Sequence, residues 1–162
     1  MQLLNIKISD NTVEHIALRF GLGLAMALTG FFFFMKAIGL VHNLELRALN
    51  ILIMFSFLLM AIKYYQRNHK ETLNYLKGVG LGLLTAIIGS LTFAIFTFIY
   101  VSFIDPEFMQ LIIEREPFGQ YLNPFIVAVT IFIEGSASGF LLTYAILQWR
   151  KTPHFSSPIE KV

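Results

Sequence analysis

Four long runs of apolar residues, separated by short polar stretches, dominate the pattern of this chain. They cover roughly residues 17–41, 46–65, 78–104 and 124–149. Each run is long enough for a helix that crosses the hydrocarbon core of a bilayer, which takes about 20 apolar residues. The run 78–104 contains no charged residue, whereas a soluble helical bundle would show polar stripes at helical spacing. The pattern predicts an all-α integral membrane protein with four transmembrane helices in a bundle.

A shorter segment between the third and fourth runs mixes apolar and charged residues. Asp105 is of a type that caps helices and Pro106 suits the first helical position, so a helix is expected to begin here; Asn123 before a proline repeats this combination at the start of span four. Pro117 and Gly119 end the segment, which is too polar and too short to cross a membrane. We therefore expect a short interfacial helix in the outer loop between spans three and four.

Composition supports this interpretation and narrows the range of partners. Of the 162 residues, 56% are hydrophobic and 14% are charged, against about 45–50% and about 25% in soluble domains. A net charge of +2 without a basic, aromatic-rich stripe argues against nucleic acid as a partner and leaves the lipid bilayer as the expected environment. The absence of cysteine excludes disulfides and thiolate chemistry. We expect one transmembrane domain, residues 1–150, and a flexible C-terminal tail, residues 151–162.

Positive charge is divided unequally between the two ends of the predicted spans. Lys and Arg are enriched in cytoplasmic loops, so the richer end, which includes both termini, is expected to be cytoplasmic. The richer end has Lys7, Arg19, Lys63, Arg67, Lys70, Lys77, Arg150, Lys151 and Lys161, and the other end has Lys36, Arg47 and Arg115.

Small residues recur every fourth position in three of the spans, and the two long runs are on spans three and four. Small side chains allow helix backbones to approach closely, which is how membrane helices pack in the absence of a hydrophobic driving force. We therefore predict that these residues form helix-packing surfaces, the longer one on span three. They are Gly78, Gly82, Ala86 and Ser90 on span three, and Gly135 and Gly139 on span four.

Glu134, about 15 Å from the outer end of span four, is the main candidate for chemistry within the membrane. A carboxyl group at that depth is expected to be protonated, paired or exposed to water inside the bundle. It could couple to protons or bind a cation, or it could be structural, hydrogen-bonded to a neighbouring span; Ser138 lies on the same helix face. Lys36 near the outer end of span one either reaches Glu134 or extends independently to the interface.

Enzymatic groups are not recognisable in the sequence. All four histidines fall at span ends or in loops, and no zinc-protease or nucleophile-elbow motif occurs. With no cysteine either, a metal site lacks ligands. We expect no enzyme activity, no metal and no cofactor.

Three stretches resemble a known family: residues 75–82 (YLKGVGLG), 103–108 (FIDPEF) and 133–139 (IEGSASG). They are similar to an uncharacterised family of small four-span bacterial membrane proteins, a domain of unknown function, and the resemblance covers nearly the whole chain. It implies a four-helix domain in a bacterial inner (cytoplasmic) membrane, and it implies no activity, ligand or catalytic residue.

Two functional hypotheses remain open. The first is a non-catalytic accessory, assembly or scaffolding subunit that packs against other membrane proteins or forms a homo-oligomer. The second is a small oligomeric transporter or channel, coupled to protons or cations through Glu134.

Overall fold

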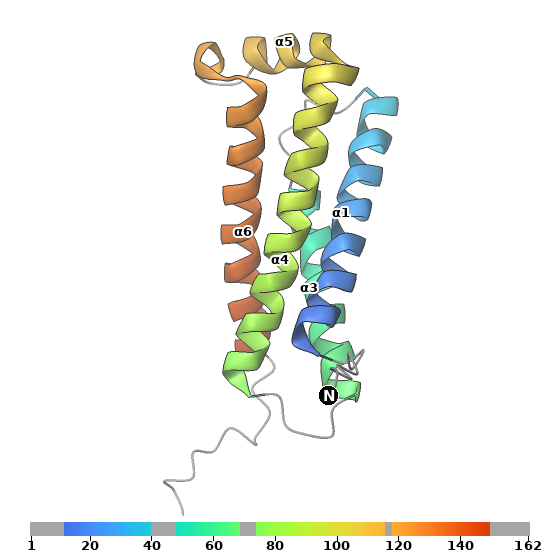
Figure 1. Ribbon diagram of the computed structural model, residues 1–162, viewed down its shortest axis with the longest axis vertical. Helices are drawn as coiled ribbons and strands as arrows, with labels where there is room; N and C mark the ends of the chain where they lie inside the picture. The colour runs from blue at the N-terminus through green and yellow to red at the C-terminus, as the bar shows by residue number, and fades with distance from the viewer. Residues whose placement is uncertain (1–11, 40–47, 69–73, 116–117, 150–162) are drawn as a thin grey trace, which may run out of the picture.

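A computed structural model of the chain describes residues 12–39, 48–68, 74–115 and 118–149. Four long helices run side by side, and a short one lies across one end of them (Figure 1). The described residues form α1 (Val13–Ala37), α3 (Leu49–Asn68), α4 (Tyr75–Ile99), the π-helical turn η1 (Tyr100–Ile104), α5 (Pro106–Arg115), the 3-10 turn η2 (Gly119–Tyr121) and α6 (Pro124–Trp149). The predicted tail at 151–162 lies outside the described residues.

The prediction of an all-helical fold with four long apolar helices is confirmed. α1, α3, α6 and the continuous helix made by α4 and η1 are each long and apolar enough to cross a membrane. Their outer surfaces carry large apolar side chains, such as Met26 at 71% and Leu76 at 75% exposed. Extended apolar surfaces of this kind are unusual in soluble monomers. They fit a chain surrounded by lipid.

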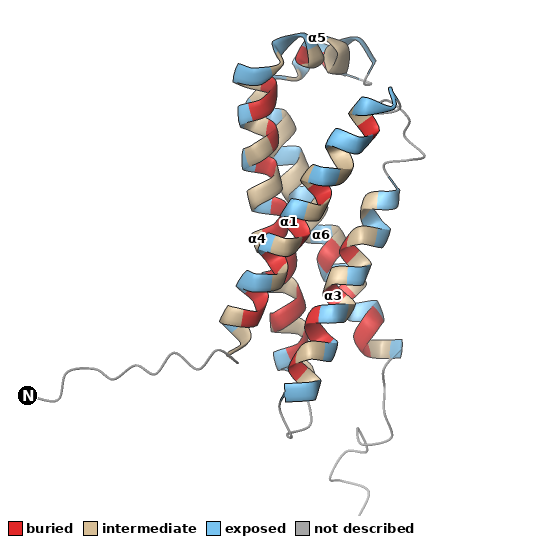
Figure 2. Ribbon diagram, turned by 90° about the vertical axis from the view of Figure 1, so that its right-hand side faces the viewer, coloured by how far each residue is buried: buried red, intermediate tan, exposed pale blue. Residues whose placement is uncertain are grey.

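Helix α4 lies at the centre of the bundle. It packs most extensively against α6 and α1, which lie on opposite sides of it (Figure 1), and less against α3. The buried residues concentrate where these helices meet (Figure 2), around fully buried Leu24, Leu58 and Leu81. α5 lies across the end of the bundle at which α4 finishes. We call this the α5 end.

Side-chain caps begin the helices where capping residues were expected. The backbone N–H of Phe108 donates to Asp105 Oδ1 at 3.1 Å, and that of Ile126 donates to Asn123 Oδ1 at 2.9 Å. Such bonds satisfy donors that the first turn of a helix leaves unpaired. The predicted caps of α5 and α6 are therefore confirmed.

Between α4 and α5 the backbone widens into the π turn η1. The N–H of Asp105 donates to the carbonyl of Tyr100, five residues earlier, at 2.9 Å. This turn ends the long helix and is followed directly by the Asp105 cap and by α5. A turn that sequence periodicity does not reveal thus sets the position of the Asp105 carboxylate.

Candidate functional site

The most extensive helix contact in the bundle joins α4 to α6, and we call it the α4–α6 seam. It is built from the small residues at four-residue spacing: Gly82 faces Thr143, Ala86 faces Gly139, and Ser90 faces Gly135. A Cβ added at Gly135 would lie 2.6 Å from the Ser90 Cβ, and one at Gly139 would collide with the Ala86 Cβ. Gly78 is also buried, at the start of the same stripe on α4. The missing side chains therefore set the distance between the two helices.

A side-chain hydrogen bond between described residues crosses the α4–α6 seam. The Ser90 and Ser136 hydroxyls lie 3.1 Å apart, and Ser90 also donates to the Ala86 carbonyl at 2.7 Å. Ser136 was not among the residues singled out from the sequence, where Ser138 was. Ser138 is half-buried and makes no hydrogen bond to a described residue. Ser136 could have been found from its spacing, because it stands three residues before Gly139 and seven before Thr143 and therefore shares their helix face.

Glu134 lies just outside this seam. It directly precedes Gly135, so its side chain is rotated about 100° around the helix from the seam. The residue is exposed, and it makes no hydrogen bond or ion pair with any described residue. It stands about 15 Å along α6 from Pro124, deep in a helix about 39 Å long. The structure thus places a carboxyl group on the outside of the bundle, near the middle of the fourth long helix.

α6, which carries Glu134, is the least buried of the four long helices. Only 11% of the most apolar stretch of α6 is buried, against 28–33% in the other three long helices. α6 has extensive contacts with α4 and smaller ones with α3, while no described helix lies against its outer face (Figure 1). We call this surface the outer face of α6; its exposed residues include Ile126, Thr130, Ile133, Glu134, Ala137, Leu141 and Tyr144.

Lys36 belongs to a second polar site, at the α5 end. Its Nζ donates hydrogen bonds to the Tyr100 hydroxyl and to Asp105 Oδ2, and it forms an ion pair with Asp105. Tyr100 Oη also lies 3.3 Å from the same carboxylate oxygen. Of the two alternatives left open by the sequence, neither describes this contact. Lys36 lies in the last turn of α1, beside the junction of α4 and α5, whereas Glu134 is exposed on α6, on the far side of α4.

Aromatic rings surround this ion pair. Lys36 Nζ lies 4.9 Å from the centroid of the Tyr100 ring and 5.7 Å from that of Phe108, which are cation–π distances. Phe32 makes edge-to-face contacts that bind α1, α4 and α5 together; its partners are Phe96, Tyr100 and Phe108, with centroids 6.0, 5.2 and 5.7 Å away. The ion pair and the rings fasten α5 to the end of the bundle.

The charge of Asp105 follows from these contacts. The Lys36 hydrogen bond is the main cause that holds the pKa of the Asp105 carboxyl below its ordinary value of 3.8, assisted by the N–H of Phe108 and opposed by partial burial. Both partners keep contact with solvent, with side chains 36% and 23% exposed. Asp105 is therefore ionised at neutral pH, and its carboxylate is paired with Lys36 of the same chain.

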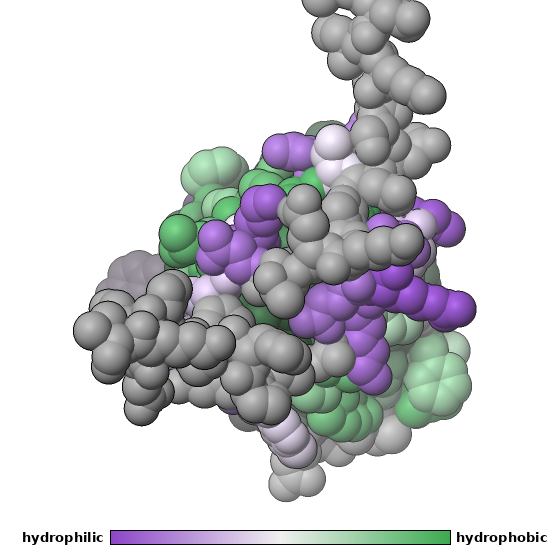
Figure 3. Space-filling view, turned by 90° about the horizontal axis from the view of Figure 1, so that it is seen from below, coloured by the Kyte–Doolittle hydropathy of each residue, from purple (hydrophilic) through white to green (hydrophobic). Residues whose placement is uncertain are grey.

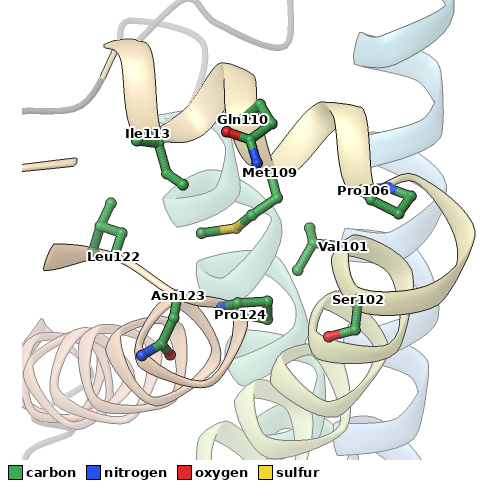
Figure 4. Close-up of a pocket in the computed structure, with 9 residues that line it drawn as sticks. All are labelled: Val101, Ser102, Pro106, Met109, Gln110, Ile113, Leu122, Asn123 and Pro124. Carbon is green, nitrogen blue, oxygen red and sulfur yellow. The ribbon is translucent and has the colours of Figure 1, made fainter. Parts of the chain in front are cut away.

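A cavity of about 400 Å³ opens beneath α5 (Figure 4). The Met109 side chain extends from α5 into it. Its lining is largely apolar and comprises Val101, Ser102, Pro106, Met109, Gln110, Ile113, Leu122, Asn123 and Pro124. A second cavity of about 280 Å³ lies between α3 and α6, lined by Phe55, Leu59, Lys63, Ile146 and Trp149. Glu134 lines neither.

Hydrophilic residues gather at the end of the bundle opposite α5, with apolar residues around them (Figure 3). Arg19, Lys63, Arg67 and Lys77 are exposed in that part of the molecule. Arg19 lies over the ring of Tyr64, with 5.9 Å from its guanidinium carbon to the ring centroid. Among the described residues, no group of three or more His, Asp or Glu is close enough to hold a metal ion.

Comparison with known proteins identifies a family and no activity. No curated protein and no solved structure matches the chain. The model of a family described as a protein of unknown function (DUF4199) matches residues 19–146. That range contains the α4–α6 seam, Glu134, and the Lys36–Asp105 pair. The resemblance of the sequence to an uncharacterised family is confirmed: this chain belongs to the DUF4199 family.

Proposed function

We propose that this chain is a non-catalytic subunit of a membrane assembly, a four-span protein that packs the outer face of α6 against another membrane helix. Its role is accessory: assembly or scaffolding. Four long apolar helices with apolar outer surfaces support the membrane location. The binding role rests on one observation, the exposed Glu134 in the middle of α6.

The proposed setting is a bacterial inner membrane with both termini in the cytoplasm. Exposed Arg19, Lys63, Arg67 and Lys77 at one end of the bundle support this orientation, because cytoplasmic ends are enriched in Lys and Arg. The α5 end then faces the periplasm. α5 buries Met109 and exposes charged residues, which suits a helix lying in the interface between lipid and water.

A lipid-facing Glu134 is energetically unfavourable. Placing an ionised acid at the centre of a membrane helix costs about 2.5–3.5 kcal/mol on insertion scales, and a protonated one still leaves polar groups unpaired. Inside its own chain the group has no partner among the described residues. A second helix with polar groups at the same depth removes that cost through interhelical hydrogen bonds. The uncovered face and the unpaired carboxyl together favour assembly.

The test is recovery of a complex from native membranes in mild detergent, comparing the wild type with two variants. Glu134→Leu removes the carboxyl, and Ile133→Leu alters the neighbouring exposed position without removing a polar group. We expect the wild type and Ile133→Leu to elute as a complex larger than one chain and Glu134→Leu to elute as a single chain. A wild-type particle that contains one chain and no partner contradicts the proposed function.

The alternative, a proton- or cation-coupled transporter or channel, uses the same carboxyl. Because Glu134 lies on the outside and lines neither cavity described above, a pathway past it would run between subunits. Glu134→Gln decides between the two in reconstituted liposomes. Proton or cation flux that the wild type carries and the variant loses favours transport, whereas unchanged flux with altered assembly favours the scaffold.

A further inference from the structure

We infer that the helix covering the outer face of α6 is α6 of a second copy of this chain, with the two Glu134 carboxyl groups hydrogen-bonded to each other across a twofold axis. The inference rests on the proposed function, whose partner it names. Three observations support it: which side chains lie at the depth of Glu134, the shape of the outer face of α6, and the symmetry of a dimer of identical chains.

The described helices of this chain offer no Lys or Arg side chain that could pair with Glu134 of a second copy. Lys36 is held by Asp105 and Tyr100 at the α5 end, and Arg19 lies over Tyr64 near the opposite end. No other Lys or Arg occurs within the described helices near the depth of Glu134. A protonated carboxyl group, by contrast, is its own complement, since it has one donor and one acceptor. Two such groups can exchange two hydrogen bonds.

In a twofold-symmetric dimer, the second carboxyl group is Glu134 of the other copy. In an isologous pair, each residue close to the axis meets its own copy. When the axis runs along the membrane normal, both copies keep the same orientation and both Glu134 side chains lie at the same depth. The pairing therefore needs no coincidence of register between two unrelated helices.

The shape of the outer face suits a close approach at this point. Ala137, one turn beyond Glu134, is exposed and small, and Thr130, one turn before it, adds a second polar group. Large apolar side chains flank this centre, with Ile133 61% and Leu141 65% exposed. A small and polar centre with apolar flanks is the arrangement by which membrane helices associate. The seam with Gly135 and Gly139 is already filled by α4, so the outer face is the surface left for the second copy.

Because the chain has no cysteine, disulfide cross-linking can test the contact residue by residue. Ala137→Cys places one thiol beside the inferred axis. Met26→Cys is the control: it is 71% exposed and lies near the middle of α1, on a helix separated from α6 by α4. In native membranes treated with copper phenanthroline, two thiols are oxidised to a disulfide by the copper and oxygen supplied. We expect a covalent dimer from Ala137→Cys at least about tenfold faster than from Met26→Cys. Equal rates overturn the inference.

Lipid dilution provides a second readout that does not depend on the introduced thiol. Fluorescently labelled wild type and Glu134→Leu are compared in liposomes by energy transfer between subunits at decreasing protein-to-lipid ratio. We expect Glu134→Leu to dissociate at a protein density about tenfold higher, the effect of a strong interhelical hydrogen bond, and Ile133→Leu to behave as the wild type. Unchanged association of Glu134→Leu overturns the inference.

The outcomes separate this inference from the proposed function. A complex that depends on Glu134, contains another protein and gives no Ala137→Cys cross-link overturns the second copy and leaves the accessory role. A rapid cross-link together with Glu134-dependent ion flux supports the second copy and overturns the accessory role.

Discussion

The two faces of α6 are built from similar residues and have opposite surroundings. The inner face places Gly135, Gly139 and Thr143 against α4, so closely that a single added carbon meets its neighbour. The outer face carries Glu134 and Ala137 and is exposed. Small residues at helical spacing therefore do not reveal whether a surface is already occupied. The difference separates residues that hold the fold from those available to a partner.

The two acidic groups of interest repeat this contrast. Asp105 caps α5 and is paired with Lys36 at the end of the bundle, where solvent also reaches it. Glu134 has no partner among the described residues and is placed in the middle of a long apolar helix. The cost of an unpaired charge rises with depth in the membrane. The paired acid belongs to the fold, and the unpaired one is the group that assembly would satisfy.

The largest effect on the fold is expected from Gly139→Ala. Its new Cβ collides with the Ala86 Cβ, and neither side chain can rotate away, so the two helices must separate. Overpacking of this kind costs about 1–3 kcal/mol. Unfolding of the purified protein by a denaturing detergent, followed by circular dichroism, measures the loss.

Gly80→Ala is the matched control, because Gly80 also lies in a helix of the bundle, α4, and a Cβ added there has no neighbouring atom within 4 Å. Replacing a helix-interior glycine by alanine favours the helix by up to about 1 kcal/mol. We expect no loss of stability at this position. An equal loss in both variants would mean that the α4–α6 seam does not limit how closely the helices pack.

Sequence patterns predicted the helices far better than their contacts. Run length and hydropathy suffice for four long helices, because each must satisfy its backbone within itself in lipid. The partner of Lys36 was beyond the same reasoning: Asp105 is 69 residues away and reaches it through the π turn at the end of α4. Glu134 and Gly135 are neighbours on one helix, and only the position of α4 decides which of them faces inward.

A smaller effect is expected from Asp105→Asn. The amide can still accept the hydrogen bond from the Phe108 N–H, so the change removes the charge and keeps the cap. For a pair that retains solvent contact, we expect a loss of about 1 kcal/mol in the free energy of unfolding at neutral pH. Glu107→Gln is the control, an exposed acid two residues further on. Equal losses would show that general charge at the α5 end matters rather than the Lys36 pair.

Acidification should remove the difference in unfolding free energy between the wild type and Asp105→Asn. Because the pKa of Asp105 is lowered in the folded protein, its contribution to stability is present above its ordinary value of 3.8 and is lost as the pH falls through the lowered folded-state pKa. The unfolding free energies of the wild type and Asp105→Asn should therefore begin to converge below about pH 4 and meet only below the lowered folded-state pKa. A gap that stays constant from pH 7 to about pH 3 contradicts the ion-pair explanation.

The hydrogen bond across the seam is expected to contribute less. Ser136→Ala removes the partner of the Ser90 hydroxyl, 3.1 Å away, while leaving the packing atoms in place. Interhelical hydrogen bonds in membranes average about 0.6 kcal/mol, which is the loss we expect. Ser138→Ala should be neutral, because Ser138 makes no hydrogen bond to a described residue. A larger loss of stability from Ser138→Ala than from Ser136→Ala would favour Ser138, the serine singled out from the sequence, as the one that makes a hydrogen bond.

The smallest effect on the fold of a single chain is expected from Glu134→Leu, the counterpart of Gly139→Ala on the other face of the same helix. Glu134 is exposed in the folded chain and remains exposed to detergent when the helices separate. The free-energy cost of placing its carboxyl group in an apolar environment is therefore present in both states and cancels in the free energy of unfolding. We expect a change within about 0.5 kcal/mol, as for surface substitutions generally. The measurement is detergent unfolding at a dilution at which the wild type is a single chain. A loss as large as that of Gly139→Ala would place Glu134 among the groups that hold the bundle together, and the two faces of α6 would no longer differ in kind.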